Sequence, residues 1–151
     1  MEFETVLEWG GEYPGKLSSQ NGFTLAYSPP VEFGGIKGPL SPEDAFVGAA
    51  NMCYQIVFLG IAKSLGVEII HFKCKAVGKL ETVDGVRRFP SIALSPEVQV
   101  APGTDMSKFE KVVEAAKRKC PVTNSMNSDI SVSVTTSSRS PISLRPDVSP
   151  R

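Results

Sequence analysis

The longest apolar segment of the chain runs from Ala45 to Ala62, where 18 consecutive residues carry no charge and Asn51 and Gln55 are the only amides. Signals for starting and stopping a helix flank this run, namely Ser41, Pro42, Glu43, Asp44 and Gly66. Serine caps a helix, proline fits its first position, carboxylates favour its first turn and glycine ends it. The pattern therefore predicts a helix over about residues 42–65 that is apolar on all sides.

Outside the long apolar run, most of the alternation between apolar and polar residues is explained by strands. Alternating apolar and polar residues predict a half-buried strand over 3–9, a second strand over 23–27, a long β-hairpin with arms at 67–81 and 86–100, and a last strand over 129–136. Two segments rich in turn-forming residues separate these elements. Residues 10–22 are expected to form a hairpin or loop, and residues 28–42 a loop.

The two faces of the predicted hairpin separate its cysteine from the single histidine of the chain. Alternation along a strand places Ile70, Phe72, Cys74 and Ala76 on one face and His71, Lys73 and Lys75 on the other. We therefore expect Cys74 to be a buried core thiol and His71 to be solvated among lysines. This arrangement argues against a Cys–His dyad in the strand.

A second helix is predicted over residues 104–120, because its apolar residues form one stripe: Met106, Phe109, Val112, Val113 and Ala116. It runs into Cys120 and Pro121, where another short helical turn can begin. The end of the chain is rich in serine and proline, a composition typical of extended or mobile segments. We therefore expect one domain over residues 1–135 and a tail over 136–151.

Length and charge narrow the class of protein. A chain of 151 residues fits one domain with a core of its own. Its 16 Lys and Arg residues balance 16 Asp and Glu residues, which argues against binding to nucleic acid. The acidic, alternating N-terminus resembles neither a signal nor a transit peptide, so a cytoplasmic protein with reduced thiols is expected.

A membrane span is the alternative explanation of the apolar run, which reaches the lower limit of spanning length. Glycines and amides interrupt the run, and neither an aromatic belt nor a basic cluster flanks it. An all-round apolar helix also suits the centre of an oligomer. We therefore expect no membrane partner.

The three cysteines, Cys53, Cys74 and Cys120, form no CxxC pair, and a zinc site is disfavoured because the chain has one histidine. Two distant cysteines can perform redox chemistry if one attacks an oxidant to give a sulfenic acid and the other condenses with it to a disulfide. Cys120 lies just beyond a helix, where free backbone donors can lower a thiol pKa. The alternative is that Cys53 and Cys120 are ordinary buried cysteines.

Glu43 lies on one stripe of the long helix with Phe46, Ala50 and Cys53. Along the helix Glu43 and Cys53 are about 15 Å apart, too far for contact. If two copies packed antiparallel about an axis level with Gly48, Glu43 of one copy would face Cys53 of the other. The simpler alternative is that Glu43 interacts only with the helix dipole, which contributes about 0.3–1 kcal/mol.

Two segments together resemble the OsmC/Ohr family of thiol-dependent hydroperoxide reductases: SPEDAFVGAANMC (41–53) and AAKRKCPVTNSM (115–126). The similarity extends over most of residues 2–135. It implies an α+β fold in which antiparallel sheets wrap around the long central helices of an intertwined homodimer. Two active sites then form between the chains, and we expect Asn51 and Gln55 to hydrogen-bond across the dimer.

The resemblance also implies roles for individual residues. Cys53 corresponds to the peroxidatic thiol, Cys120 to the resolving thiol, and Glu43 to the carboxylate that holds an arginine beside the thiolate. The implied substrate is an organic or fatty-acid hydroperoxide, with hydrogen peroxide as a further candidate. A dithiol such as a lipoyl group or a thioredoxin-like protein would reduce the disulfide, and no metal or organic cofactor is required.

The chain departs from the family because residues 1–86 contain no arginine, whereas family peroxidases carry one in the N-terminal β region or the loop after it. Candidate replacement cations are Lys16, Lys37, Arg87, Arg88 or a tail arginine of the partner chain, although lysine reproduces the guanidinium geometry poorly.

Apolar walls of the peroxide pocket, from Phe46, Phe58 or the loop around Phe33, would favour organic peroxides. Two other hypotheses remain: a non-catalytic member that binds a small apolar ligand at the dimer interface, and a redox switch whose disulfide alters a contact of the tail.

Overall fold

The computed structural model of the protein describes residues 1–138, which fall into two compact units, residues 1–49 and a second unit that begins at Ala50. Most of the predicted tail therefore lies outside the described residues. The last described strand, β9 (Thr135–Ser138), extends past residue 135, where the predicted domain ends.

The first unit contains an antiparallel sheet of β1 (Thr5–Glu8), β2 (Gly15–Ser19) and β3 (Thr24–Tyr27), joined in that order, and a short 3₁₀ helix, Val31–Phe33. Strand β2 lies in the turn-rich segment that was expected to be a hairpin or loop. It is a strand because both its edges pair, with Leu17 opposite Leu7 on one side and Leu25 on the other. Every residue of β1 is exposed, so the expectation of a half-buried strand was wrong for the single chain.

The long helix α1 (Pro42–Ser64) has the bounds that its capping signals predict. The Asp44 backbone N–H donates to Ser41 Oγ at 3.0 Å, and the Ser41 hydroxyl donates to the Asp44 carboxylate at 2.8 Å. At the other end Gly66 has φ of 68°, the left-handed conformation that glycine adopts most easily, and the helix stops there. The predicted N-cap and stop residue are thus confirmed.

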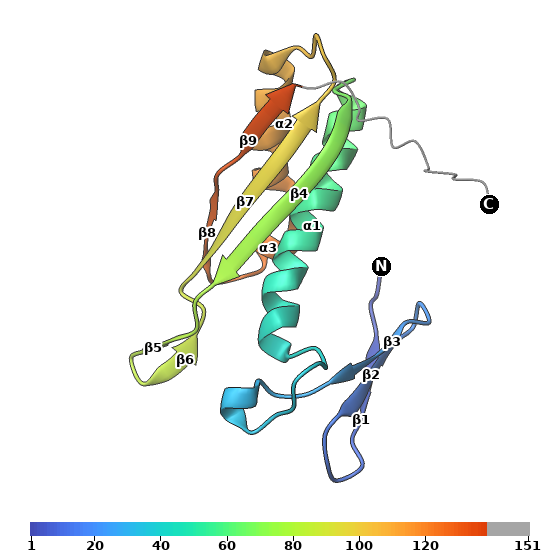
Figure 1. Ribbon diagram of the computed structural model, residues 1–151, viewed down its shortest axis with the longest axis vertical. Coiled ribbons are helices and arrows are strands. Elements are labelled where there is room, and N and C mark those ends of the chain that lie inside the picture. The colour runs from blue at the N-terminus through green and yellow to red at the C-terminus, as the bar shows by residue number, and fades with distance from the viewer. Residues whose placement is uncertain (139–151) are drawn as a thin grey trace, which may run out of the picture. The chain divides into compact units, whose positions relative to one another are not determined.

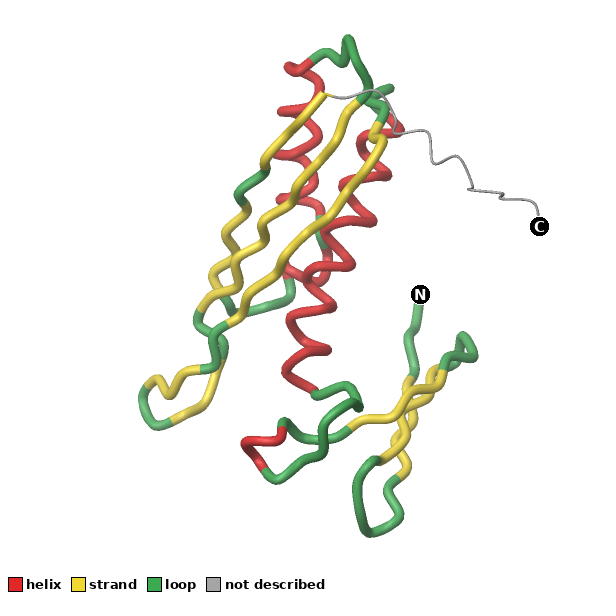
Figure 2. Tube along the Cα trace, viewed as in Figure 1, coloured by secondary structure: helices red, strands yellow, loops and turns green. Residues whose placement is uncertain are grey.

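The second unit is built on a four-stranded sheet (Figures 1 and 2). Strands β4 (Ile69–Gly78) and β7 (Ser91–Val100) pair antiparallel, and β8 (Asp129–Val132) and β9 both pair parallel to β7. The short strands β5 (Glu81–Val83) and β6 (Val86–Arg88) form a separate hairpin around Asp84 and Gly85, both with positive φ. The predicted hairpin is therefore interrupted, and the single predicted last strand is two strands.

Helices α2 (Met106–Lys119) and α3 (Pro121–Asn124) complete the second unit. Asp105 caps α2 by accepting from the backbone N–H groups of Ser107 and Lys108. Figure 1 shows α1 and α2 on the same face of the sheet. Their buried side chains form the core against the inward residues of β7: Tyr54, Phe58, Phe109, Val112 and Ala116 with Ile92, Leu94, Val98 and Val100.

Phe58 of α1 lies at the centre of this core. It is fully buried, and its ring centroid is 5.3 Å from that of Phe72 on β4 and 5.9 Å from that of Phe109 on α2. Such aromatic contacts join three elements in one cluster. Phe58 therefore cannot form the solvent-accessible wall of a peroxide pocket, and that expectation was wrong.

Candidate active site

The structure brings together two of the cysteines that the sequence singled out. Cys53 lies in the middle of α1, and Cys120 lies between α2 and α3, where it is the last cap of one helix and the first cap of the next. The two side chains are within hydrogen-bonding distance of each other. All three cysteines of the chain are free thiols.

Access differs between the two sulfur atoms. Cys53 is half-buried, whereas Cys120 has no exposed surface. The turn that holds Cys120 is fixed locally, because the Thr123 hydroxyl donates to the Cys120 carbonyl at 3.3 Å and the Asn124 amide donates to the Arg118 carbonyl at 2.8 Å. A molecule from solvent therefore meets Cys53 before it meets Cys120.

A backbone donor completes the thiol pair. The Val122 N–H hydrogen-bonds to the Cys53 sulfur. Val122 is in the first turn of α3, where backbone N–H groups have no partner within the helix. The sequence analysis expected free backbone donors at this junction but assigned them to Cys120, whereas the Val122 N–H acts on Cys53.

The pKa of the Cys53 thiol lies above its usual value. Burial is the largest cause, and the hydrogen bond and negative charge of Cys120 raise it further. The Val122 N–H opposes these effects because it stabilises the thiolate. Burial and the neighbouring sulfur outweigh the single backbone donor.

Glu43 lies in the first turn of α1, ten positions before Cys53. Its Oε2 atom is buried and has no hydrogen-bond partner among the described residues. A buried carboxylate oxygen usually has a donor, so this atom is a candidate for contact with a group from outside the described chain. The chain itself does not bring Glu43 to Cys53, as expected from their separation along the helix.

Tyr54 follows Cys53 directly and was not identified from the sequence. Its side chain is 1% exposed, and its hydroxyl oxygen is buried without a hydrogen-bond partner among the described residues. The available signal was that Tyr54 is the only hydroxyl-bearing residue in the apolar run from Ala45 to Ala62. The sequence of that run does not show which groups from other elements pack around the hydroxyl, and these decide whether it has a hydrogen-bond partner.

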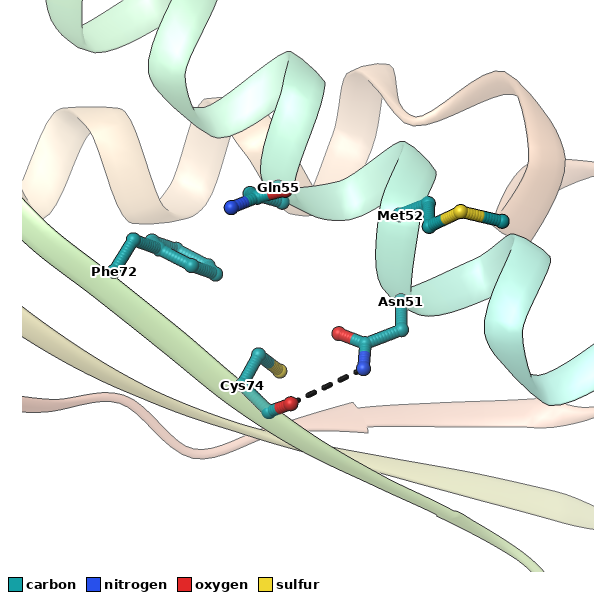
Figure 3. A pocket seen from close by; sticks show the side chains of 5 residues that line it. All are labelled: Asn51, Met52, Gln55, Phe72 and Cys74. Carbon is teal, nitrogen blue, oxygen red and sulfur yellow. Dashed lines mark hydrogen bonds between the residues drawn. The ribbon is translucent and has the colours of Figure 1, made fainter.

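Cys74 faces α1 from β4, as the strand alternation predicts, but it is half-buried rather than buried. It lines a cavity of about 150 Å³ with Asn51, Met52, Gln55 and Phe72 (Figure 3). The Asn51 amide donates to the Cys74 carbonyl at 3.1 Å within the chain, and the expected hydrogen bonds across a dimer stay a prediction. Burial raises the pKa of the Cys74 thiol, so this sulfur stays protonated at neutral pH.

Two of the proposed replacement cations, Lys16 and Arg88, already have other contacts. Lys16 Nζ lies 2.7 Å from Glu8 Oε2, and this pair holds the pKa of the Glu8 carboxyl below its usual value. Arg88 donates to the Val83 carbonyl and lies 3.9 Å from Asp84. The described interactions of the Cys53 sulfur involve Cys120 and Val122 and no cation. Residues 1–138 also hold no cluster of three or more His, Cys, Asp or Glu side chains suited to a metal ion.

Known proteins of two kinds resemble this chain in sequence. Peroxiredoxin OsmC of Escherichia coli (strain K12) is 28% identical over 129 residues, which cover 82% of this chain and 89% of that protein. The organic hydroperoxide resistance protein of Xanthomonas axonopodis pv. citri (strain 306) is 27% identical over 131 residues, which cover 83% and 87%.

Solved structures show the same fold. An OsmC-like protein of unknown function from Vibrio cholerae matches with a TM-score of 0.83 at 20% identity, covering 89% of this chain and 99% of that one. The organic hydroperoxide resistance protein of Bacillus subtilis matches with a TM-score of 0.62 at 20% identity, covering 89% and 98%. These likenesses establish the α+β, OsmC-like fold that the sequence predicts. The sequence model of the OsmC-like protein family matches residues 35–135, which include both Cys53 and Cys120, and the protein belongs to that family.

Proposed function

We propose that the protein is a thiol-dependent peroxidase that reduces organic hydroperoxides, with hydrogen peroxide as a slower substrate. The Cys53 thiolate attacks the terminal peroxide oxygen, the O–O bond breaks, and an alcohol leaves after taking a proton. Cys53 becomes a sulfenic acid. The Cys120 sulfur then attacks the Cys53 sulfur, releases water and forms the Cys53–Cys120 disulfide.

The observation that carries this proposal is the contact between the half-buried Cys53 and the buried Cys120. A peroxidatic sulfur needs access to substrate, and a resolving sulfur needs to be within bonding reach of it. The names of the relatives, a peroxiredoxin and an organic hydroperoxide resistance protein, support the same chemistry. These names also support a role in an oxidative stress response.

An external dithiol completes the cycle. It is oxidised to its own disulfide while the protein disulfide returns to two thiols, so two electrons are transferred. A lipoyl group or a thioredoxin-like protein has this chemistry, and both belong to the reducing cytoplasm. No cofactor is required, because the two cysteines carry the electrons.

We also propose that the active form is a homodimer. The surface of α1 opposite the core carries Met52, Ile56 and Leu59, which are 61, 69 and 38% exposed. A Cβ atom added at Gly48 or Gly60 would meet nothing within 4 Å, so another helix can approach closely. By length and composition α1 could also cross a membrane, a property that the core helix of a soluble protein shares. A second copy accounts for this surface, and an antiparallel pairing brings Glu43 of one chain to Cys53 of the other.

The proposal is tested by mixing reduced protein with one equivalent of cumene hydroperoxide or of hydrogen peroxide. Thiol loss is followed by stopped flow, and disulfides are mapped by mass spectrometry. The expected result is a Cys53–Cys120 bond that forms faster with the organic peroxide, no reaction in Cys53→Ser, and the parent rate in Cys74→Ser. Thiols that stay reduced for many minutes would contradict the peroxidase.

The raised pKa of Cys53 favours a second candidate function. A thiol that is protonated at neutral pH reacts slowly with peroxide, as a non-catalytic ligand-binding member of the family would. The same stopped-flow experiment separates the two functions, because a ligand-binding protein leaves the peroxide unreduced.

A further inference from the structure

Three consecutive cations occupy the last turn of α2, namely Lys117, Arg118 and Lys119, which we call the basic patch. All three residues are exposed, and none of them forms an ion pair within residues 1–138. The neighbouring sequence does not balance their charge, because residues 115–128 contain no aspartate or glutamate. The basic patch is therefore a local excess of positive charge on a chain whose formal net charge is zero.

The helix dipole alone accounts for a cation at this end of α2, where each Lys or Arg contributes about 0.3–1 kcal/mol. Two observations leave the basic patch with more charge than this role requires. The Arg118 carbonyl already accepts a hydrogen bond from the Asn124 amide at 2.8 Å, and the Cys120 carbonyl accepts one from the Thr123 hydroxyl at 3.3 Å. The three cations are also about 100° apart around the helix, so they spread positive charge over most of its end.

The basic patch lies next to the candidate active site. Lys119 immediately precedes Cys120, so their Cα atoms are about 3.8 Å apart. Val122, whose N–H hydrogen-bonds to the Cys53 sulfur, follows two residues after Cys120. Exposed charges act over about 10 Å at 0.1 M salt, so a molecule that approaches Cys53 from solvent enters the field of the basic patch.

We propose that the basic patch binds the acidic surface of a protein dithiol that reduces the Cys53–Cys120 disulfide. This inference rests on the proposed function and specifies the charge of its reductant. One thiolate of the reductant attacks the Cys53 sulfur, and the electron pair of the S–S bond leaves on Cys120. The second thiol of the reductant then displaces Cys53 from the mixed disulfide. The reductant loses two electrons and two protons, and the protein regains two thiols.

Complementary charge acts mainly on the rate of encounter. A positive patch beside a reactive group raises the association rate constant of an acidic protein, and salt removes this advantage. A small neutral dithiol gains nothing from the patch. The inference therefore predicts that the protein distinguishes reductants by their charge.

The test uses two peptides that differ only in charge. Both contain one Cys-Gly-Pro-Cys dithiol, which is flanked on each side by glutamates in one peptide and by lysines in the other. The Cys53–Cys120 disulfide is formed with diamide, and its reduction by each peptide is followed by rapid acid quench and mass spectrometry. The rate constant for the glutamate peptide divided by that for the lysine peptide is the charge selectivity. Because it is a ratio for one protein, partial loss of active protein cancels.

Lys117→Gln/Arg118→Gln/Lys119→Gln is expected to lower the charge selectivity about tenfold at low salt, since the patch no longer attracts the glutamate peptide. Raising NaCl from about 20 to about 300 mM should lower the selectivity of the parent in the same direction, because salt shortens the range of the charges. Equal selectivity in the parent and in this variant would overturn the inference.

Lys73→Gln/Lys75→Gln/Lys79→Gln is the matched control, because it removes the same charge from exposed residues elsewhere. Lys73 and Lys75 lie on the face of β4 turned away from α1, and Lys79 follows that strand. This variant should keep the selectivity of the parent. An equal fall in both triple variants would show that net charge, and not the basic patch, selects the reductant, and would overturn the inference.

The proposed peroxidase and the proposed docking surface fail in different ways. If peroxide leaves the thiols reduced, the peroxidase is wrong, while diamide still supplies the disulfide for the selectivity measurement. If diamide also forms no Cys53–Cys120 bond, binding decides. A labelled glutamate peptide with serines in place of its cysteines is then titrated with the protein at low salt, and its fluorescence anisotropy is measured. Equal affinity for the parent and for the variant without the basic patch overturns the docking role.

An anionic substrate is the other molecule that these cations could attract. If the variant without the basic patch slowed oxidation by a fatty-acid hydroperoxide while its charge selectivity for the peptides stayed at the parent value, the cations would serve the substrate. That result would overturn the assignment of the basic patch to the reductant.

Discussion

At Cys53, burial and a neighbouring sulfur disfavour the thiolate more than one backbone N–H favours it. Because only the thiolate attacks peroxide, the rate constant for thiol oxidation should rise about tenfold per pH unit until the pKa of Cys53 is reached, above the usual thiol range. Stopped flow between pH 6 and 10 measures this profile. A rate constant that is already flat below pH 7 would contradict it and would show that a cation from outside the described chain lowers the pKa.

The raised pKa of Cys53 also makes the stability of the fold depend on pH. Since the folded pKa of Cys53 is raised above the unfolded value, the folded state holds the thiol proton more tightly than the unfolded state does. This contribution to the free energy of unfolding is fully present below the unfolded thiol pKa and is lost as pH rises through the folded value.

Tyr54→Phe should not lower the free energy of unfolding, although the residue is buried in the core. Because the Tyr54 hydroxyl is buried without a hydrogen-bond partner in residues 1–138, its removal should leave the free energy unchanged or raise it by up to about 1 kcal/mol. Phe58→Ala, in the same core, should lower it by about 3–5 kcal/mol. Urea denaturation of both variants provides the measurement, and a loss above about 1 kcal/mol in Tyr54→Phe would show that the hydroxyl has a structural partner.

Cys53 and Cys120 could be identified from the sequence through their local context and family resemblance. The sequence did not reveal that the Tyr54 hydroxyl is buried without a hydrogen-bond partner among the described residues, because burial depends on how α1 packs in the core. The Val122 donor was within reach of sequence reasoning, since Pro121 marks a helix start. The roles of the three predicted site residues, Glu43 included, stay predictions.

The short helix α3, of four residues, contributes directly to the candidate site, because its first turn supplies the N–H group that hydrogen-bonds to the Cys53 sulfur. Val122→Pro removes this donor and breaks no bond within the helix. The variant should have a higher Cys53 pKa and about tenfold slower thiol oxidation at neutral pH, since one hydrogen bond to a charged group is lost.

Val122→Ala is the control for that experiment, because it shortens the side chain and keeps the N–H. It should oxidise at close to the parent rate, and the unfolding midpoints of both variants verify that the unit is intact. If proline and alanine had equal effects, the N–H of Val122 would have no part in the chemistry.

Element boundaries were predictable where local chemistry sets them. Ser41 and Gly66 defined α1, whose bounds the structure reproduces closely. Strand β2 was missed because its pairing with β1 and β3, not its turn-rich composition, makes it a strand. The last predicted strand is divided because β8 and β9 pair with separate parts of β7, on either side of Ser95 and Pro96. Pairing between strands that are far apart in the chain leaves no local signal in the sequence.

The proposed homodimer would cover the apolar surface of α1 and the buried Glu43 oxygen, which has no hydrogen-bond partner among the described residues. In the proposed antiparallel homodimer, position 43 of one chain faces Cys53 of the other. Glu43→Cys in a Cys74→Ser/Cys120→Ser background leaves thiols only at positions 43 and 53. These positions are about 15 Å apart along one helix, so a disulfide between them must join two chains.

Mild oxidation of that variant should therefore give a covalent dimer on non-reducing gel electrophoresis, with a Cys53-containing crosslink by mass spectrometry. Asp44→Cys in the same background is the matched control, since residue 44 is one position further around the helix and its side chain is exposed. It should remain monomeric on the gel. A monomer in both variants, or equal crosslinking in both, would contradict the antiparallel pairing and with it the placement of Glu43 at the partner's thiol.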